Sequence, residues 1–215
     1  MRTVLLTGFE PFDQDTLNPS WEAVRRLDGS LAGDNVRIVA RQLPCVFAQA
    51  PARLLQLLDE HQPVLVIAVG LAQGRSDLSI ERVAINLNDA RIADNLGDQP
   101  IDTPVIPGAP AAYFSTLPIK AVVRALRDAG IPASVSQTAG TFVCNQVFYY
   151  LQHSLAGSSV RSGFIHIPLL PEQAAHNAQG QPSLALDLLV EGLHIAVIAA
   201  LHTEHDVQET GGQVC

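Results

Sequence analysis

The chain carries little positive charge. Of its 215 residues, 13 are Lys or Arg and 21 are Asp or Glu, so the formal net charge is −8 at pH 7. No run of basic residues occurs. A protein that binds nucleic acid or an anionic membrane surface by charge needs such a cluster. We therefore expect no nucleic-acid partner and no membrane partner.

Cysteine is also scarce. The three cysteines are Cys45, Cys144 and Cys215, and no C-x-x-C pair or zinc-ligand spacing is present. An odd number without such spacing argues against a disulfide framework. The count favours free thiols in a reducing compartment, so we expect a cytoplasmic protein.

No long apolar run is uninterrupted. The longest apolar stretch, 184–201, contains Asp187, Glu191 and His194, which is typical of a buried helix rather than a membrane span. The apolar segment at the N-terminus is too short for the core of a signal peptide. With 47% apolar and 16% charged residues, the composition is that of a globular protein.

Short β-branched runs alternate along the chain with segments of helical spacing. Strands are expected at 2–9, 35–43, 63–70, within 75–89, and at 131–137 and 162–171. Helices are expected at 19–29, 47–61, 118–130, around Cys144 and at 183–202. This order predicts an α/β three-layer single domain, with a mainly parallel twisted central sheet and helices on both faces. We expect that domain over 1–204 and a flexible tail over 205–215.

A long loop is predicted from Ala90 to Tyr113, with a short strand near 103–106 as an open alternative. Loops of this length in a compact domain usually have a role in function or association. The apolar, proline-rich part at 99–117 favours burial against a second subunit. The alternative is that it packs on its own domain.

One cysteine has a setting suited to chemistry. In TAGTFVCNQVFYYLQ (138–152), Cys144 lies a few residues into a predicted helix, after a turn of small residues. Unpaired N–H groups and the helix dipole at that position lower a thiol pKa and can bind an oxyanion. The alternative is packing, because a free cysteine behaves as a small apolar residue.

A nucleophilic cysteine needs a base and a group that orients the base. Cys144, His166 and Glu81 supply one of each, at or near the ends of predicted strands or at a helix start. Alternation places His166 on the opposite face of its strand from Ile165 and Ile167. A structural histidine and a solvated glutamate are the ordinary alternatives, and six other histidines compete for the role of base.

Five segments together resemble the pyroglutamyl peptidase I (pyrrolidone carboxyl peptidase) family of cysteine peptidases. They are TGFEPFDQDTLNPSWEAV (7–24), GRSDLSIERVAINLNDARIADN (74–95), QPIDTPVIPGAP (99–110), TAGTFVCN (138–145) and GFIHIPLLPEQ (163–173). The resemblance implies that Glu81, Cys144 and His166 are the catalytic residues. It also implies a single α/β domain, often a homotetramer, that needs no cofactor and removes N-terminal pyroglutamate from peptides. Family members often carry Gln where this chain has Leu71.

A pyroglutamyl residue is a neutral lactam, so its site should be a flat apolar slot with a few polar groups. Phe9, Phe12, Phe142 and Val143 are candidates for its walls, with ordinary core packing as the alternative. Asn18 and the backbone near Leu71 are candidates to bind the lactam. The resemblance favours Arg91 near the oxyanion, against an ordinary ion pair.

Two other functions stay open at this point. A protein of the same fold could bind pyroglutamyl peptides without turnover. Layered α/β folds also host nucleoside-processing enzymes, since fold does not dictate function. That alternative would require glycine-rich phosphate loops with basic residues, and TGFEPF and AGTFVCN contain no lysine.

Overall fold

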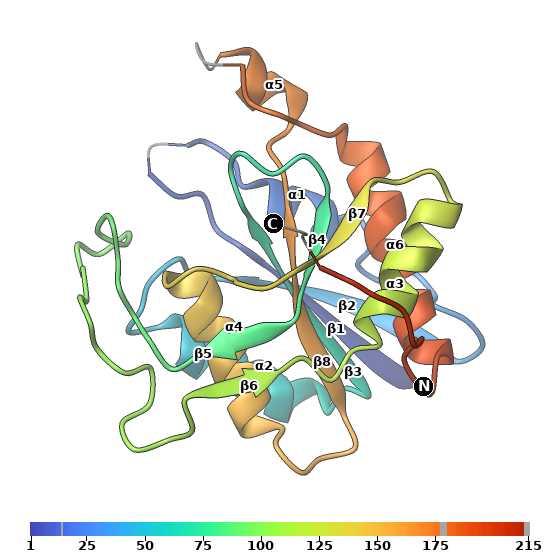
Figure 1. Cartoon of the computed structure of the whole chain (residues 1–215), viewed down its shortest axis with the longest axis horizontal. Helices are drawn as coiled ribbons and strands as arrows, with labels where there is room; N and C mark the ends of the chain where they lie inside the picture. The colour runs from blue at the N-terminus through green and yellow to red at the C-terminus, as the bar shows by residue number, and fades with distance from the viewer. Residues whose placement is uncertain (14, 177–179, 213–215) are drawn as a thin grey trace.

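The computed structural model describes residues 1–13, 15–176 and 180–212 (Figure 1). A six-stranded central sheet has the order β2-β1-β3-β8-β4-β7. Its strands are β1 (Arg2–Phe9), β2 (Val36–Leu43), β3 (Leu65–Leu71), β4 (Leu78–Glu81), β7 (Ala133–Ser136) and β8 (Arg161–Ile167). A separate two-stranded antiparallel ribbon pairs β5 (Val83–Ile85) with β6 (Ala112–Phe114).

Four of the central strands, β2, β1, β3 and β8, run parallel to one another. The strand β4 pairs antiparallel with β8 and parallel with β7. The sheet is therefore mainly parallel, as predicted, with one antiparallel junction between β8 and β4. This junction lies within the candidate site.

Helices cover both faces of the sheet, which confirms the predicted three layers (Figure 1). On one face lie α1 (Pro19–Arg25), α3 (Ile119–Asp128) and α6 (Leu186–His202). The other face is covered by α2 (Ala50–His61) and α4 (Val143–Ser154). A short helix, α5 (Pro171–Ala175), which the sequence analysis did not predict, follows β8.

The alternation of side chains along each strand builds two cores. In β1, Val4 and Leu6 pack toward α1, α3 and α6, whereas Leu5 packs toward α2 and α4. Burial of each such aliphatic side chain contributes about 1.5–3 kcal/mol. The same alternation in β3, β4 and β8 decides which side chains point toward α4, the helix that carries the candidate nucleophile Cys144.

The long loop is present between β5 and β6, but no strand forms at 103–106 in this described part of the chain. A single bridge between Asn88 and Thr103 stands there instead. The segment after α6 packs on the domain up to Gly212: the Asp206 carboxylate accepts hydrogen bonds from the backbone of Lys120 and Ala121, and Arg82 donates to the Gly211 carbonyl. Figure 1 shows this red segment crossing α3. Cys215 lies outside the described residues.

Among the described residues, no helix has the length and apolar character needed to cross a membrane.

Candidate active site

His166 and Glu81 meet on the α4 face of the sheet. Ile165 and Ile167 of β8 pack into the core on the opposite face, so His166 projects toward α4, as its alternation predicted. In β4, Ile80 packs into the same core as the two isoleucines, so Glu81 shares the face of His166. The antiparallel pairing of β4 with β8 brings the two side chains together in space.

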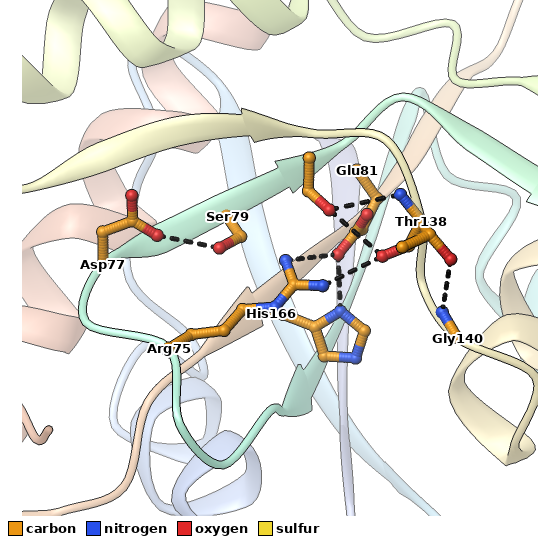
Figure 2. Close-up of polar contacts among 8 residues, drawn as sticks. Arg75, Asp77, Ser79, Glu81, Thr138, Gly140 and His166 are labelled. Atoms are coloured by element: carbon orange, nitrogen blue, oxygen red, sulfur yellow. Dashed lines mark hydrogen bonds and ion pairs between the residues drawn. The ribbon is translucent and has the colours of Figure 1, made fainter. Parts of the chain in front are cut away.

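The two side chains form a short hydrogen bond, 2.7 Å from His166 Nδ1 to Glu81 Oε1 (Figure 2). Both are buried, with 3% of His166 and none of Glu81 exposed. A carboxylate accepts hydrogen bonds, so Nδ1 carries the proton and Nε2 keeps its lone pair. Figure 2 shows the second ring nitrogen pointing away from Glu81. The imidazole is thus oriented to act as a base.

Cys144 is the second residue of α4, where the first turn has N–H groups without intrahelical acceptors. Its thiol lies against Gly70 of β3, the residue that pairs with His166 in the parallel ladder. A Cβ built at Gly70 would lie 2.9 Å from Cys144 Sγ and 2.9 Å from the Phe164 ring. The absence of a side chain at Gly70 therefore makes room for the thiol beside the His166 strand.

We expect Gly70→Ala to lower kcat by about 100-fold, because the thiol or the Phe164 ring must shift from its place. Steady-state kinetics on protein shown to be folded by circular dichroism would measure this. Gly211→Ala is a matched control, since its new methyl would lie 3.3 Å from flexible Lys120 and from Val135. Wild-type turnover in Gly70→Ala would contradict the placement of the thiol.

Asn145, next to Cys144, fixes the start of α4. Its side-chain oxygen accepts from the Ile85 backbone at 3.0 Å, and its amide donates to the carbonyls of Ile85 and Leu87 at 2.9 and 3.1 Å. These bonds tie the helix to β5, two residues beyond Glu81, and so hold two parts of the site together.

Burial and, after it, the Glu81 charge raise the pKa of Cys144 to about 12, against smaller lowering by Arg75 and a backbone hydrogen bond. The sequence predicted a lowered pKa from the helix start, and that prediction is wrong because desolvation is the larger effect. The resting side chain is therefore a neutral thiol, and it needs a base.

Burial lowers the pKa of His166 from its usual 6.5, and the Arg75 charge adds to this, while Glu81 opposes it. A neutral imidazole is consequently the form present at neutral pH. A neutral thiol and a neutral imidazole with a free Nε2 suit proton transfer from sulfur to nitrogen during the attack.

Three aromatic rings cluster at the start of α4, where Phe142 is the N-cap residue. The Phe142 ring lies 5.2 Å from Phe12 and 5.1 Å from Phe47, centre to centre. The sequence analysis selected Phe12 and Phe142 but missed Phe47, which lies far from every site motif in the sequence. Phe9 packs in the same core, 6.4 Å from Phe164, and Val143 is fully buried there.

The predicted polar contacts lie as follows. Asn18 caps α1: its Oδ1 accepts from the backbone and hydroxyl of Ser20, and its Nδ2 donates to the Glu10 carbonyl. Leu71 follows Gly70, so its side chain faces away from Cys144. Arg91 is exposed in the long loop. The roles of all three in substrate binding stay predictions.

Comparison with known proteins shows to which family the chain belongs. The family model described as pyroglutamyl peptidase matches residues 2–203. The chain belongs to the pyroglutamyl peptidase family. Among its relatives, the pyrrolidone-carboxylate peptidase of Pseudomonas fluorescens strain SBW25 is 69% identical over 214 residues, and that of Cupriavidus taiwanensis is 65% identical over 217. Each alignment covers 100% of both chains.

Solved structures of the pyroglutamyl peptidase family share the fold. Pyroglutamyl peptidase I of Bacillus amyloliquefaciens is 49% identical, with a TM-score of 0.91 over 96% of this chain and 100% of that one. Pyrrolidone carboxyl peptidase of Thermococcus litoralis is 37% identical, with a TM-score of 0.93 over 98% and 100%. The resemblance found in the sequence is confirmed, and no observation favours a nucleoside-processing enzyme.

One polar side chain of the site was not selected from the sequence of this pyroglutamyl peptidase. Arg75 forms an ion pair with Glu81, 2.9 Å from Nη1 to Oε1, and donates from Nη2 to the Thr138 carbonyl at 2.9 Å (Figure 2). It lies in the segment GRSD, six residues before Glu81. An arginine in the turn after a buried strand, shortly before a candidate catalytic acid, was the available signal.

Proposed function

We propose that this pyroglutamyl peptidase is a cysteine exopeptidase that removes N-terminal pyroglutamate (5-oxoproline) from peptides. Cys144 is the nucleophile, His166 the general base and acid, and Glu81 the group that orients His166. The buried 2.7 Å hydrogen bond between His166 and Glu81, on the face that carries the Cys144 thiol, is the observation that supports this most. The names of the relatives agree with the substrate.

The reaction follows from the protonation states. Cys144 Sγ attacks the carbonyl carbon of the pyroglutamyl residue as its proton moves to His166 Nε2. The imidazolium that forms is stabilised by Glu81 at Nδ1. When the C–N bond breaks, Nε2 returns the proton to the leaving amine, and a thioester to Cys144 remains. Water, deprotonated by the same nitrogen, then attacks the thioester, the C–S bond breaks, Nε2 returns its proton to Cys144 Sγ, and pyroglutamate is released.

The aromatic cluster supports the choice of substrate. The lactam of pyroglutamate is flat and uncharged, and Phe12, Phe47 and Phe142 offer apolar ring surfaces at the start of the helix that carries the nucleophile. We place the ring of the substrate against this cluster. Phe9 and Val143 lie behind it in the core, and Asn18, Arg91 and the Leu71 backbone are the candidate polar contacts.

A fluorogenic pyroglutamyl amide, assayed under reducing conditions beside the alanyl and prolyl amides, tests the proposal. We expect release from the pyroglutamyl compound alone, with loss of activity after treatment with iodoacetamide. Pyroglutamate binding without turnover would favour the binding-protein alternative. Equal rates on all three amides would contradict the substrate.

We also propose a homo-oligomer, with a tetramer favoured by the family resemblance. Phe114 of β6 is 71% exposed and Ile101 in the long loop is 61% exposed, and both are apolar side chains that a second copy would cover. Sedimentation velocity would then give a mass well above the 23.0 kDa of one chain.

The free thiols Cys45 and Cys144 support a reducing, cytoplasmic location.

A further inference from the structure

The Glu81 carboxylate is in an unusual electrostatic position. It is fully buried, and among the described residues its Oε2 has no hydrogen-bond partner. Its ion pair with Arg75 and its hydrogen bond with His166 are both made at Oε1. Because His166 is neutral at rest, Arg75 is the one resting counter-charge for Glu81 among the described residues. Burial of a charged carboxylate is costly unless a counter-charge or hydrogen bonds compensate it.

Arg75 also touches the turn that leads into the nucleophile helix. Its Nη2 donates to the Thr138 carbonyl, which also accepts from Ser136 Oγ at 3.1 Å. Thr138 Oγ1 in turn accepts from the Gly140 backbone at 3.0 Å. Figure 2 shows the guanidinium bonded both to the carboxylate and to this turn. One side chain therefore connects the acid of the site to the approach of α4.

The local chain geometry aims Arg75 at this place. Gly74 has φ +88°, a conformation that other residues rarely adopt, and the Arg75 backbone donates to the Ala72 carbonyl at 3.2 Å. This tight turn sends the side chain back over the end of β4. One face of Arg75 borders a cavity of about 710 Å³ along β7, and 26% of its side chain is exposed.

We propose that Arg75 is a positioning residue, which holds the Glu81 carboxylate against His166 and fixes the turn that precedes Cys144. This rests on the proposed function of Glu81 and His166. The positive charge of Arg75 opposes protonation of His166, and it also favours the Cys144 thiolate. With Arg75 in place, His166 therefore stays neutral, and able to accept the thiol proton, down to a lower pH than it would without Arg75.

The other titratable groups around His166 are few. Cys144 lies on α4, which covers this face of the sheet. Ser79 pairs with His166 across the antiparallel junction, and the Ser79 hydroxyl donates to Asp77. Gly70 of β3 and Ser136 of β7 face the pair without charge. Arg75 and Glu81 are thus the charges that decide the protonation of His166.

The test is Arg75→Gln, with Arg75→Lys as the conservative variant. Arg127→Gln is the matched control, since Arg127 lines the same cavity but donates to the Ala133 carbonyl. The first readout is the His166 pKa measured by NMR titration, with the resonance assigned by comparison with His166→Gln. The second is the pH dependence of kcat/KM. The NMR readout needs no turnover, so it is valid even if the substrate proposal fails.

We expect the His166 pKa to rise by about 1 unit in Arg75→Gln and to stay near the wild-type value in Arg75→Lys and Arg127→Gln. The acid limb of the kcat/KM profile should move to higher pH by the same amount. At pH values below the wild-type limb, kcat/KM of Arg75→Gln should then be about tenfold lower than that of the wild type. Arg75→Lys should lower kcat at all pH values, because one ammonium cannot hold both Glu81 and Thr138 as the guanidinium does. An unchanged His166 pKa in Arg75→Gln would overturn the proposal.

Discussion

Replacement of Cys144 by alanine should abolish hydrolysis of the pyroglutamyl amide, with a loss on the order of 10⁵- to 10⁶-fold. The reason is that the methyl group of alanine cannot attack the substrate carbonyl and form the thioester. Fold and stability should survive, because Cys144 is only partly buried among apolar neighbours and alanine suits a helix. Steady-state kinetics and a thermal melt measure the two effects separately.

The matched control for this variant is Cys45→Ala. Cys45 is a buried free thiol in the same core, and burial raises its pKa strongly. We expect Cys45→Ala to keep turnover within about threefold, since its backbone makes the bonds to Glu10 and Asn95, and alanine keeps that backbone. Wild-type rates in Cys144→Ala would remove it from the role of nucleophile.

Covalent evidence distinguishes the nucleophile from a merely structural thiol. Acid quench during turnover should trap one pyroglutamyl group on the peptide that contains Cys144, read by mass spectrometry. Because that thiol is neutral at rest, its alkylation by iodoacetamide should quicken as the pH rises. A label found on Cys45 or Cys215 instead would contradict the assignment.

The sequence predicted the parts of the site that depend on local pattern. Alternation in GFIHIP places His166 on one face of its strand, and small residues before Cys144 indicate a helix start. The strands themselves are short β-branched runs in a buried sheet, which explains why most of them were located correctly. Such signals reach only a few residues along the chain.

The parts that depend on contacts between distant segments could not be predicted. The antiparallel direction of β4 depends on how the chain returns to the sheet, and no residue of LSIE encodes it. The pKa of Cys144 was predicted in the wrong direction because its burial arises from β3 and β8, far away in the sequence. Arg75 reaches Thr138, 63 residues later, so its role emerges only from the folded structure.

Replacement of Glu81 by glutamine should lower kcat by on the order of 10²- to 10⁴-fold while the fold survives. Glutamine has the shape of glutamate, so its carbonyl can still accept from His166 and Arg75. Two things are lost: the charge that stabilises the imidazolium, and the certainty that Nδ1 carries the proton, since the amide can also donate to Nδ1 and turn the lone pair away from the thiol.

Asp77→Asn is the control for loss of a carboxylate near the same strand, since Asp77 directly precedes β4 and Glu81 ends it. Asp77 accepts from Ser79 at 2.8 Å and does not touch His166, so this variant should stay within about threefold of wild type. For Glu81→Gln, the decisive measurement is the pH dependence of kcat, with circular dichroism to show that the variant is folded. Removal of the Glu81 charge favours neutral His166, so the acid limb should move to lower pH even as kcat falls. A fall in kcat together with a rise of that limb would mean that Glu81 acts on the fold rather than on the imidazole.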